Sequence, residues 1–227
     1  MYSIVHFDTL DSTNDECKRN YRAYRNQSVI VTKTQTKGRG RFDRVWESEK
    51  DLTFSILYKE KKPSLLIFPL AIVYTLQSHE INAMIKWPND ILIDGKKVCG
   101  MLMETMYEGT KQNAFIVGIG INLSKKSEAL ANKSTYLSLD ASMLLQEILN
   151  TIDHLMEMQP EDLLQQYQQY HYLYKKEIVL NNQHYLVGHV QLDGSLTVFL
   201  GDASFTLYGE EVTLESIYQP SSTTGSR

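Results

Sequence analysis

The dipeptide Asp94-Gly95 stands between two apolar, β-branched segments at residues 91–93 and 97–106. A two-residue Asp-Gly link favours the type I′ turn, whose backbone twist matches that of two paired antiparallel strands. The chain is therefore expected to reverse direction at this point. The sequence predicts a β-hairpin here, which commits the middle of the chain to a sheet.

Apolar and β-branched runs elsewhere predict further members of that sheet. They lie at residues 3–7, 28–32, 52–58, 84–87 and 114–121. Capping residues, 3.6-residue periodicity and Pro160 predict helices. A first, short helix is expected to begin at residues 11–13. Three further helices are expected at residues 68–79, 140–158 and 160–172. The expected fold is an α+β domain, a mixed β-sheet with helices, over residues 1–174.

The pattern changes after Lys175 to short strands separated by Asn, Asp and Gly. The strands are expected at residues 177–180, 184–191, 195–200, 204–207 and 211–214. Closely spaced short strands of this kind predict a small β-barrel over residues 175–218. The last residues, 219–227, are rich in Ser and Thr and are expected to be a disordered tail.

Composition restricts the partners and the cellular location. The net charge of −4 and the pI near 5.9 disfavour nucleic acid or an anionic membrane as the main partner. Cys17 and Cys99 have no second ligand at metal-binding spacing, which is typical of thiols in a reducing compartment. The chain shows neither a signal-peptide pattern nor an apolar run of about 20 residues. We therefore expect a cytoplasmic protein.

Residues 35–46, QTKGRGRFDRVW, form a basic segment containing two glycines. Glycine allows close approach of the backbone to a ligand, and the planar arginine side chain suits phosphate. Trp46 is suited to stacking on a base. The Gly-Lys-Ser/Thr ending of a Walker loop is absent. Taken alone, the segment fits an anion-binding loop and a solvated surface loop equally well.

Three other stretches each have a structural explanation beside a functional one. Residues 11–14, DSTN, suit a helix cap or a polar ligand wall. Residues 86–90, KWPND, suit a turn between strands or a binding loop, and Lys97 lies seven positions further on. Residues 118–122, GIGIN, allow a backbone or a ligand to lie against a strand.

Together, in this order, these motifs closely resemble biotin protein ligase, the biotin–[biotin carboxyl carrier protein] ligase family. The resemblance is strong over residues 8–122 and extends more loosely through the small C-terminal module, where residues 209–214 resemble the closing strand of the family. It implies the biotin/lipoate ligase fold, which is similar to that of class II aminoacyl-tRNA synthetases, followed by an SH3-like β-barrel. It implies the substrates biotin and Mg²⁺·ATP, the intermediate biotinyl-5′-AMP, and transfer of biotin to a lysine of a biotin carboxyl carrier protein domain.

The resemblance also implies roles for individual residues. The expected catalytic residues are Lys97, Arg39 and Arg41. The expected biotin-binding residues are Ser12, Thr13, Asn14, Gln35, Arg39, Gly40, Arg41 and Lys97. The expected ATP-binding residues are Gly38, Arg41, Arg44, Trp46, Lys86, Asn89, Asp90 and Asn122. A protein ligand for Mg²⁺ is not defined, although Asp90 is the nearest candidate.

The chain departs from the family pattern at two places beside the basic loop. Asp43 replaces a common glycine, and residues 48–52 replace the usual Ser-Pro-x-Gly-x-Asn-Leu stretch. Ser12 follows a single predicted strand, so we expect no DNA-reading module ahead of it. A sheet edge leaves open a homodimer or pairing with the carrier domain. The rival hypotheses are a lipoate ligase or octanoyltransferase of the same fold and a non-catalytic vitamin-binding protein.

Overall fold

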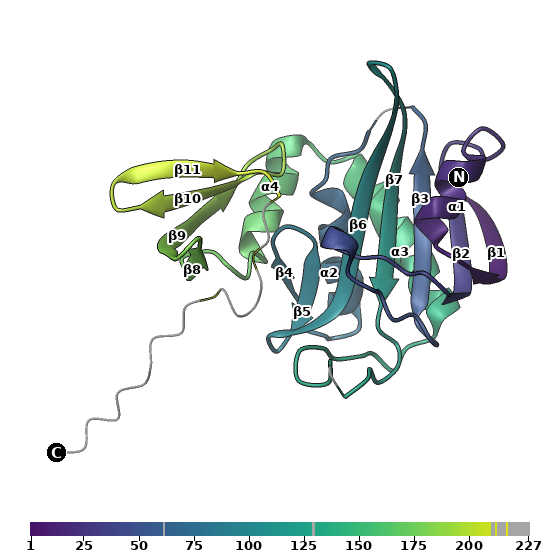
Figure 1. Ribbon diagram of the computed structural model, residues 1–227, viewed down its shortest axis with the longest axis horizontal. Helices are drawn as coiled ribbons and strands as arrows, with labels where there is room; N and C mark the ends of the chain where they lie inside the picture. The colour runs from purple at the N-terminus through teal and green to yellow at the C-terminus, as the bar shows by residue number, and fades with distance from the viewer. Residues whose placement is uncertain (61, 129, 210–211, 213–216, 218–227) are drawn as a thin grey trace.

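The computed structural model describes residues 1–60, 62–128, 130–209, 212 and 217. Its largest element is a seven-stranded sheet with the order β1-β2-β3-β7-β6-β5-β4 (Figure 1). The strands are β1 (Ser3–Leu10), β2 (Ser28–Gln35), β3 (Leu52–Tyr58), β4 (Met84–Lys86), β5 (Asp90–Ile93), β6 (Lys96–Glu108) and β7 (Lys111–Ile121). β1 and β2 are parallel and all other neighbours are antiparallel, so the predicted mixed sheet is confirmed.

The predicted hairpin at Asp94-Gly95 is present between β5 and β6, where Ile93 pairs with Lys96. Both turn residues have positive φ, 49° for Asp94 and 74° for Gly95, as a type I′ turn requires. The dipeptide therefore determines the local path of the chain as the sequence predicted.

Alternation along the two central strands divides the sheet into a core face and a ligand face. On β3 the side chains of Phe54 and Ile56 enter the main core, and the intervening Ser55 faces the other side. On β7 Val117 and Ile119 do the same. Gly118 and Gly120, which lie between and beyond them, face the opposite side, because successive side chains in a strand point to opposite faces.

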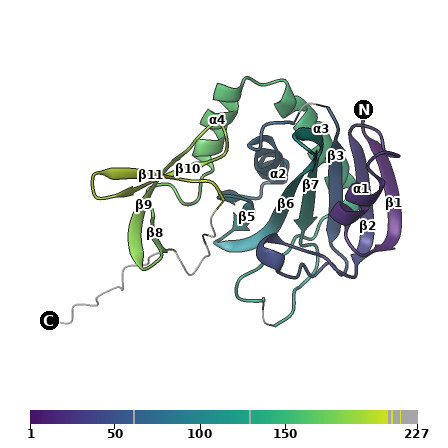
Figure 2. The same cartoon turned by 45° about the horizontal axis from the view of Figure 1, so that its top comes forward.

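Helices cover both faces of the sheet, unequally (Figures 1 and 2). The helices are α1 (Thr13–Asn20), α2 (Ile67–Ser78), α3 (Ala141–Met156) and α4 (Pro160–Gln169). α2 and α3 pack in the main core, and α1 packs over a smaller cluster around Cys17, Ile30 and Ile116. This leaves part of the α1 face open for a ligand. None of the helices in the described ranges has the length and apolar character needed to cross a bilayer.

Some element bounds differ from prediction because tertiary pairing extends or shortens them. β2 continues to Gln35, since Thr34 and Gln35 pair with the end of β1. α4 ends at Gln169, and His171 instead forms a parallel bridge to Ile85. A one-turn 3₁₀ helix, η1 (Arg41–Asp43), lies inside the segment expected to be a loop.

A second, four-stranded antiparallel sheet follows the helices, in the order β11-β10-β9-β8. Its strands are β8 (Glu177–Leu180), β9 (Gln183–Val190), β10 (Leu196–Leu200) and β11 (Ala203–Leu207). The predicted strand at 211–214 lies outside the described residues except for Val212, and the tail at 219–227 lies wholly outside them. Four of the five predicted strands are therefore confirmed.

The two sheets are joined by buried contacts and share one core. The indole N–H of Trp87 donates to the carbonyl of Gly194 at 2.9 Å, and the Gln168 amide donates to Val190 at 2.7 Å. Val187 and Val198 of the small sheet belong to the main core. The small sheet is therefore fixed against the larger domain.

His171 is buried at this junction beside the ring of Tyr167, and neither of its ring nitrogens has a hydrogen-bond partner among the described residues. Burial, together with repulsion by His189, lowers the pKa of His171 to about 4. Below its ordinary pKa, the unfolded chain binds this proton while the folded protein does not. The free energy of unfolding must therefore fall as pH decreases from about 6.5 toward 4.

We expect His171→Phe to remove this part of the pH dependence, because phenylalanine fills a similar site without polar atoms. Urea unfolding of both proteins at pH 7 and pH 5 measures the effect. The wild type should lose about 2 kcal/mol more than the variant between these pH values. Equal losses in the two proteins would contradict a neutral, buried His171.

Candidate functional site

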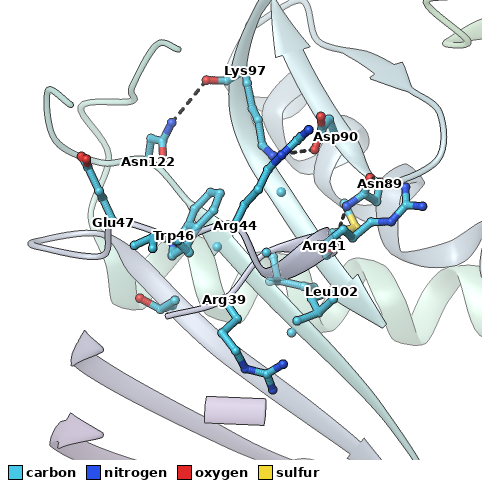
Figure 3. Close-up of a pocket in the computed structure, with 18 of the residues that line it drawn as sticks. Arg39, Arg41, Arg44, Trp46, Glu47, Asn89, Asp90, Lys97, Leu102 and Asn122 are labelled. Atoms are coloured by element: carbon cyan, nitrogen blue, oxygen red, sulfur yellow. Dashed lines mark hydrogen bonds and ion pairs between the residues drawn. The ribbon is translucent and has the colours of Figure 1, made fainter. Parts of the chain in front are cut away.

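A cavity of about 500 Å³ lies between the ligand face of the sheet and the covering loop, defined here as residues 36–46 (Figure 3). It is lined by nearly all of the predicted site residues, namely Ser12, Thr13, Asn14, Gln35, Arg39, Gly40, Arg41, Arg44, Trp46, Lys86, Asn89, Asp90, Lys97 and Asn122. Gly38 is not among its lining residues; its backbone packs against Trp46 and Gln35. The sequence motifs, far apart in the chain, thus meet at one site.

One end of the cavity is a compact set of uncharged hydrogen-bonding groups. The backbone N–H and the hydroxyl of Thr13 lie 2.8 and 3.2 Å from Oε1 of Gln35. Ser55 Oγ donates to Oδ1 of Asn14 at 2.6 Å and lies 2.7 Å from the Thr13 hydroxyl. Ser12 caps α1, accepting from the backbone N–H of Asp15. The polar end is therefore preorganised by the start of α1, the end of β2 and the middle of β3.

Glycines on β7 make room for two of the lining side chains. A Cβ at Gly118 would lie 2.3 Å from Oδ1 of Asn14, and one at Gly120 would lie 2.4 Å from the Trp46 indole. The indole also reaches Gly100 on β6. Glycine is required at these positions because of close approach, and Trp46 consequently lies flat against the sheet.

The opposite end of the cavity is cationic. Lys97 Nζ lies 2.6 Å from one carboxylate oxygen of Asp90, and Lys86 Nζ lies 3.4 Å from the other. Figure 3 shows Arg44 extending from the covering loop toward the same two residues, Asp90 and Lys97. Lys97 also lies over the Trp46 ring, 5.4 Å from its centroid. Several cations thus share one carboxylate, and this arrangement suits an anionic ligand.

The pKa values of this cluster follow from burial and neighbouring charge. Burial would raise the pKa of Asp90, but attraction by Lys97 and Lys86 outweighs it and keeps the pKa below the ordinary value. Burial lowers the pKa of Lys86, and repulsion by Lys97 and Arg41 adds to this, with Asp90 opposing. An incoming phosphate would relieve that repulsion.

The covering loop is folded back on itself. Arg39 and Val45 form an antiparallel bridge, and Trp46 N–H donates to the carbonyl of Gly38 at 2.9 Å. Phe42 has φ +55° and ψ 40°, a left-handed conformation that non-glycine residues rarely adopt. The family glycine is missing at Asp43, yet the left-handed residue is its neighbour Phe42. Nothing is described of the Asp43 side chain.

The covering loop contacts the protein on two sides. Arg41 donates to Oδ1 of Asn89 at 3.3 Å and to the carbonyl of Gly209 beyond the small sheet. Figure 3 shows Arg39 directed away from Lys97 and Asp90. Its Nη2 lies 2.5 Å from Oδ1 of Asp15 on α1. Arg39 and Arg41, both predicted to be catalytic, thus contact different parts of the protein.

Sequence reasoning missed several residues of the site. Thr53 lines the cavity from β3, and Ser55, on the same face of that strand, supports Thr13 and Asn14; the alternation of the strand was a signal that could have indicated both. Lys126 lies 5.7 Å from the Trp46 ring centroid and is paired with buried Asp51. That contact joins segments 75 residues apart, which no local pattern reveals.

Three buried polar atoms of lining residues have no hydrogen-bond partner among the described residues. They are Oγ1 of Thr53, Nε1 of Trp46 and Oδ1 of Asn122. Buried polar groups are normally hydrogen-bonded, so these three atoms are exceptions in the walls of the cavity.

The site does not fit a protein-held magnesium ion. In the described ranges no group of three or more His, Cys, Asp or Glu side chains is arranged to hold a metal ion. Asp90, the expected candidate, has its carboxylate oxygens occupied by Lys97 and Lys86. We therefore assign it no metal.

The fold is that of biotin protein ligases. The biotin protein ligase from Aquifex aeolicus in complex with biotin and ATP superposes with a TM-score of 0.79 at 24% identity, covering 93% of this chain and 97% of that one. The biotin acetyl coenzyme A carboxylase synthetase from Helicobacter pylori with bound biotinylated ATP gives 0.68 at 20% identity, covering 91% and 100%.

Residues 6–122 match the model of the Biotin/lipoate A/B protein ligase family, and the chain belongs to that family. The bifunctional ligase/repressor BirA of Bacillus spizizenii is 38% identical over 110 residues, which are 44% of this chain and 34% of that protein. The biotin–[acetyl-CoA-carboxylase] ligase of Paracoccus denitrificans is 30% identical over 129 residues, 52% of this chain and 54% of that protein. The chain thus spans about a third to a half of these relatives.

Proposed function

We propose that this protein is a biotin protein ligase that activates biotin with ATP and transfers it to a lysine of a biotin carboxyl carrier protein domain. The observation that carries the proposal is the polarity of the cavity. An uncharged hydrogen-bonding end and a cationic end share one cavity, with Lys97 at the cationic end. This suits a ligand with a polar ring and a carboxylate that must meet a phosphate.

The neutral end fits the ureido ring of biotin. Thr13, Asn14 and Gln35 line this end and carry both donors and acceptors, as a cyclic urea with N–H and C=O groups requires, and Ser55 supports Thr13 and Asn14 from behind. Because these groups already hold one another in place, the ring would bind without large rearrangement.

The cationic end fits the reacting groups. When the biotin carboxylate attacks the α-phosphate, the bond to the β-phosphate breaks and pyrophosphate leaves; negative charge accumulates on the phosphoryl oxygens in the transition state, and preorganised cations stabilise it. We assign to Lys97 the contact with both the carboxylate and the α-phosphate, and the lining residues Arg41, Arg44 and Lys86 add positive charge. In the second step the carrier lysine attacks the acyl carbon of biotinyl-5′-AMP, an amide forms, and AMP leaves.

The nucleotide is assigned to the Trp46 side of the cavity. Its indole is flat against Gly120 and Gly100, while Asn89 and Asn122 lie nearby along the wall. Mg²⁺, expected from the resemblance, is assigned no protein ligand and no step. The covering loop would shield the mixed anhydride from water.

We further infer that the small sheet is part of an SH3-like barrel, because Ile217 bridges back to Ile178 on its β8 edge. The edge strand β1 offers a surface for a carrier domain or for a second copy of the chain, whereas Ile85 of β4 already bonds to residues 170 and 172. We also propose that the protein is located in the cytoplasm.

Lipoate ligation is the alternative within the family. Exchange of pyrophosphate into ATP, measured with biotin and lipoate side by side, tests the proposal and separates the two acids.

A further inference from the structure

Two basic and two acidic side chains form an ion-pair network beside the covering loop. Lys18 Nζ lies 3.4 Å from Asp15 and 2.6 Å from Glu104, while Arg39 Nη2 lies 2.5 Å from Asp15 and 3.7 Å from Glu104. Each cation therefore contacts both acids. We call these four residues the latch.

The latch joins three separate parts of the fold. Asp15 and Lys18 lie one turn apart on α1, Glu104 lies on β6, and Arg39 is the member from the covering loop. The four side chains are 22–33% exposed. Partly buried, networked charges are screened less by solvent than isolated surface pairs.

The latch lies behind the cavity rather than in it. Asp15, Lys18 and Glu104 are not lining residues, whereas Arg39 is. These three would therefore influence a bound ligand only through the lining residues that they contact.

Glu104 also connects the latch to the neutral end of the cavity. Its Oε2 accepts from Nδ2 of Asn14 at 2.8 Å, and Oδ1 of the same Asn14 accepts from Ser55 at 2.6 Å. One carboxylate thus contacts the loop through one oxygen and orients a cavity-lining amide through the other.

We propose that Asp15, Lys18 and Glu104 are positioning residues that hold the covering loop closed through Arg39, and that they thereby retain the activated acid. The statement about retention rests on the proposed function; the statement about loop closure does not. Opening the loop would take away one of the two cations that Asp15 and Glu104 share, and this loss favours the closed state.

Limited proteolysis with trypsin tests loop closure directly, since Lys37, Arg39, Arg41 and Arg44 are cleavage sites. The variants are Asp15→Asn and Glu104→Gln, which remove charge, preserve shape and leave every cleavage site intact. Glu104→Gln also keeps an oxygen that accepts from Asn14. The matched control is Asp8→Asn, which removes the pair between Asp8 and Lys33, whose side chains are 87% and 82% exposed.

We expect cleavage within residues 37–44 to accelerate about threefold to tenfold in the latch variants and to remain unchanged in the control. In 1 M NaCl, where the Debye length is about 3 Å, the wild type should approach the variants. Unfolding temperatures should stay close to the wild-type value. Equal cleavage rates in wild type and latch variants would overturn the proposal.

A second measurement follows release of radiolabelled adenylate after biotin and ATP are added. The latch variants should release it severalfold faster while pyrophosphate exchange at saturating substrates remains within about twofold of wild type. Faster cleavage without faster release would overturn the retention role. If no adenylate forms in any protein, the proposed function fails, and trypsin cleavage still decides whether the latch exists.

Discussion

Replacing Lys97 by alanine is expected to reduce biotin-dependent pyrophosphate exchange by about 100-fold to 1000-fold, the effect of removing one preorganised charge from a transition state. Lys97 lies at the cationic end of the cavity, 2.6 Å from Asp90. Binding of biotin itself should survive within a few-fold, because the neutral end of the cavity is unchanged. The measurements are exchange kinetics and biotin titration by calorimetry.

The structure provides a control for this variant. Lys96 is the exposed neighbour of Lys97, so Lys96→Ala should leave exchange unchanged. Asp90 keeps its contact with Lys86 in Lys97→Ala, so the fold should be retained. Loss of biotin binding in step with loss of exchange would indicate a general defect, and unchanged exchange would exclude Lys97 from the chemistry.

The second large effect is expected from two glycines that are two positions apart on β7. Gly118→Ala places a methyl group 2.3 Å from Oδ1 of Asn14, and Gly120→Ala places one 2.4 Å from the Trp46 indole. Both clashes require the lining side chain to move. We therefore expect Gly118→Ala to raise the KM for biotin and Gly120→Ala to raise the KM for ATP, each by about tenfold or more.

Each glycine variant is the control for the other, because both alter the same strand by one methyl group. Initial-rate measurements with each substrate varied in turn separate the two constants. Equal effects of the two variants on both constants would contradict the assignment of the acid to the Asn14 end and the nucleotide to the Trp46 end.

Local chemistry explains why much of the fold could be predicted. Asp94-Gly95 determines the β5–β6 turn, and Ser12 caps α1 where the capping pattern placed it. Strands β3 and β8 have the predicted bounds, because polar turn residues on both sides of each apolar run define where the strand begins and ends. Strand order depends on contacts between distant segments, so no local pattern could give it.

The sequence predicted those residues of the candidate site that belong to recognisable motifs. The contacts that distinguish its residues are tertiary, and the sequence could not show them. Arg39 and Arg41 are two positions apart in one basic segment, yet Arg39 pairs with Asp15 and Arg41 reaches Gly209. The two side chains diverge because of how the covering loop folds, including the left-handed conformation of Phe42. A phenylalanine in the sequence does not predict that conformation.

Pyrophosphate exchange into ATP, measured with biotin and with lipoate under identical conditions, tests the central claim most directly. It reports formation of the acyl-adenylate alone and needs no acceptor protein. The account predicts exchange that depends on added biotin and that is absent, or far slower, with lipoate. Equal exchange with lipoate, or no exchange with either acid, would contradict it.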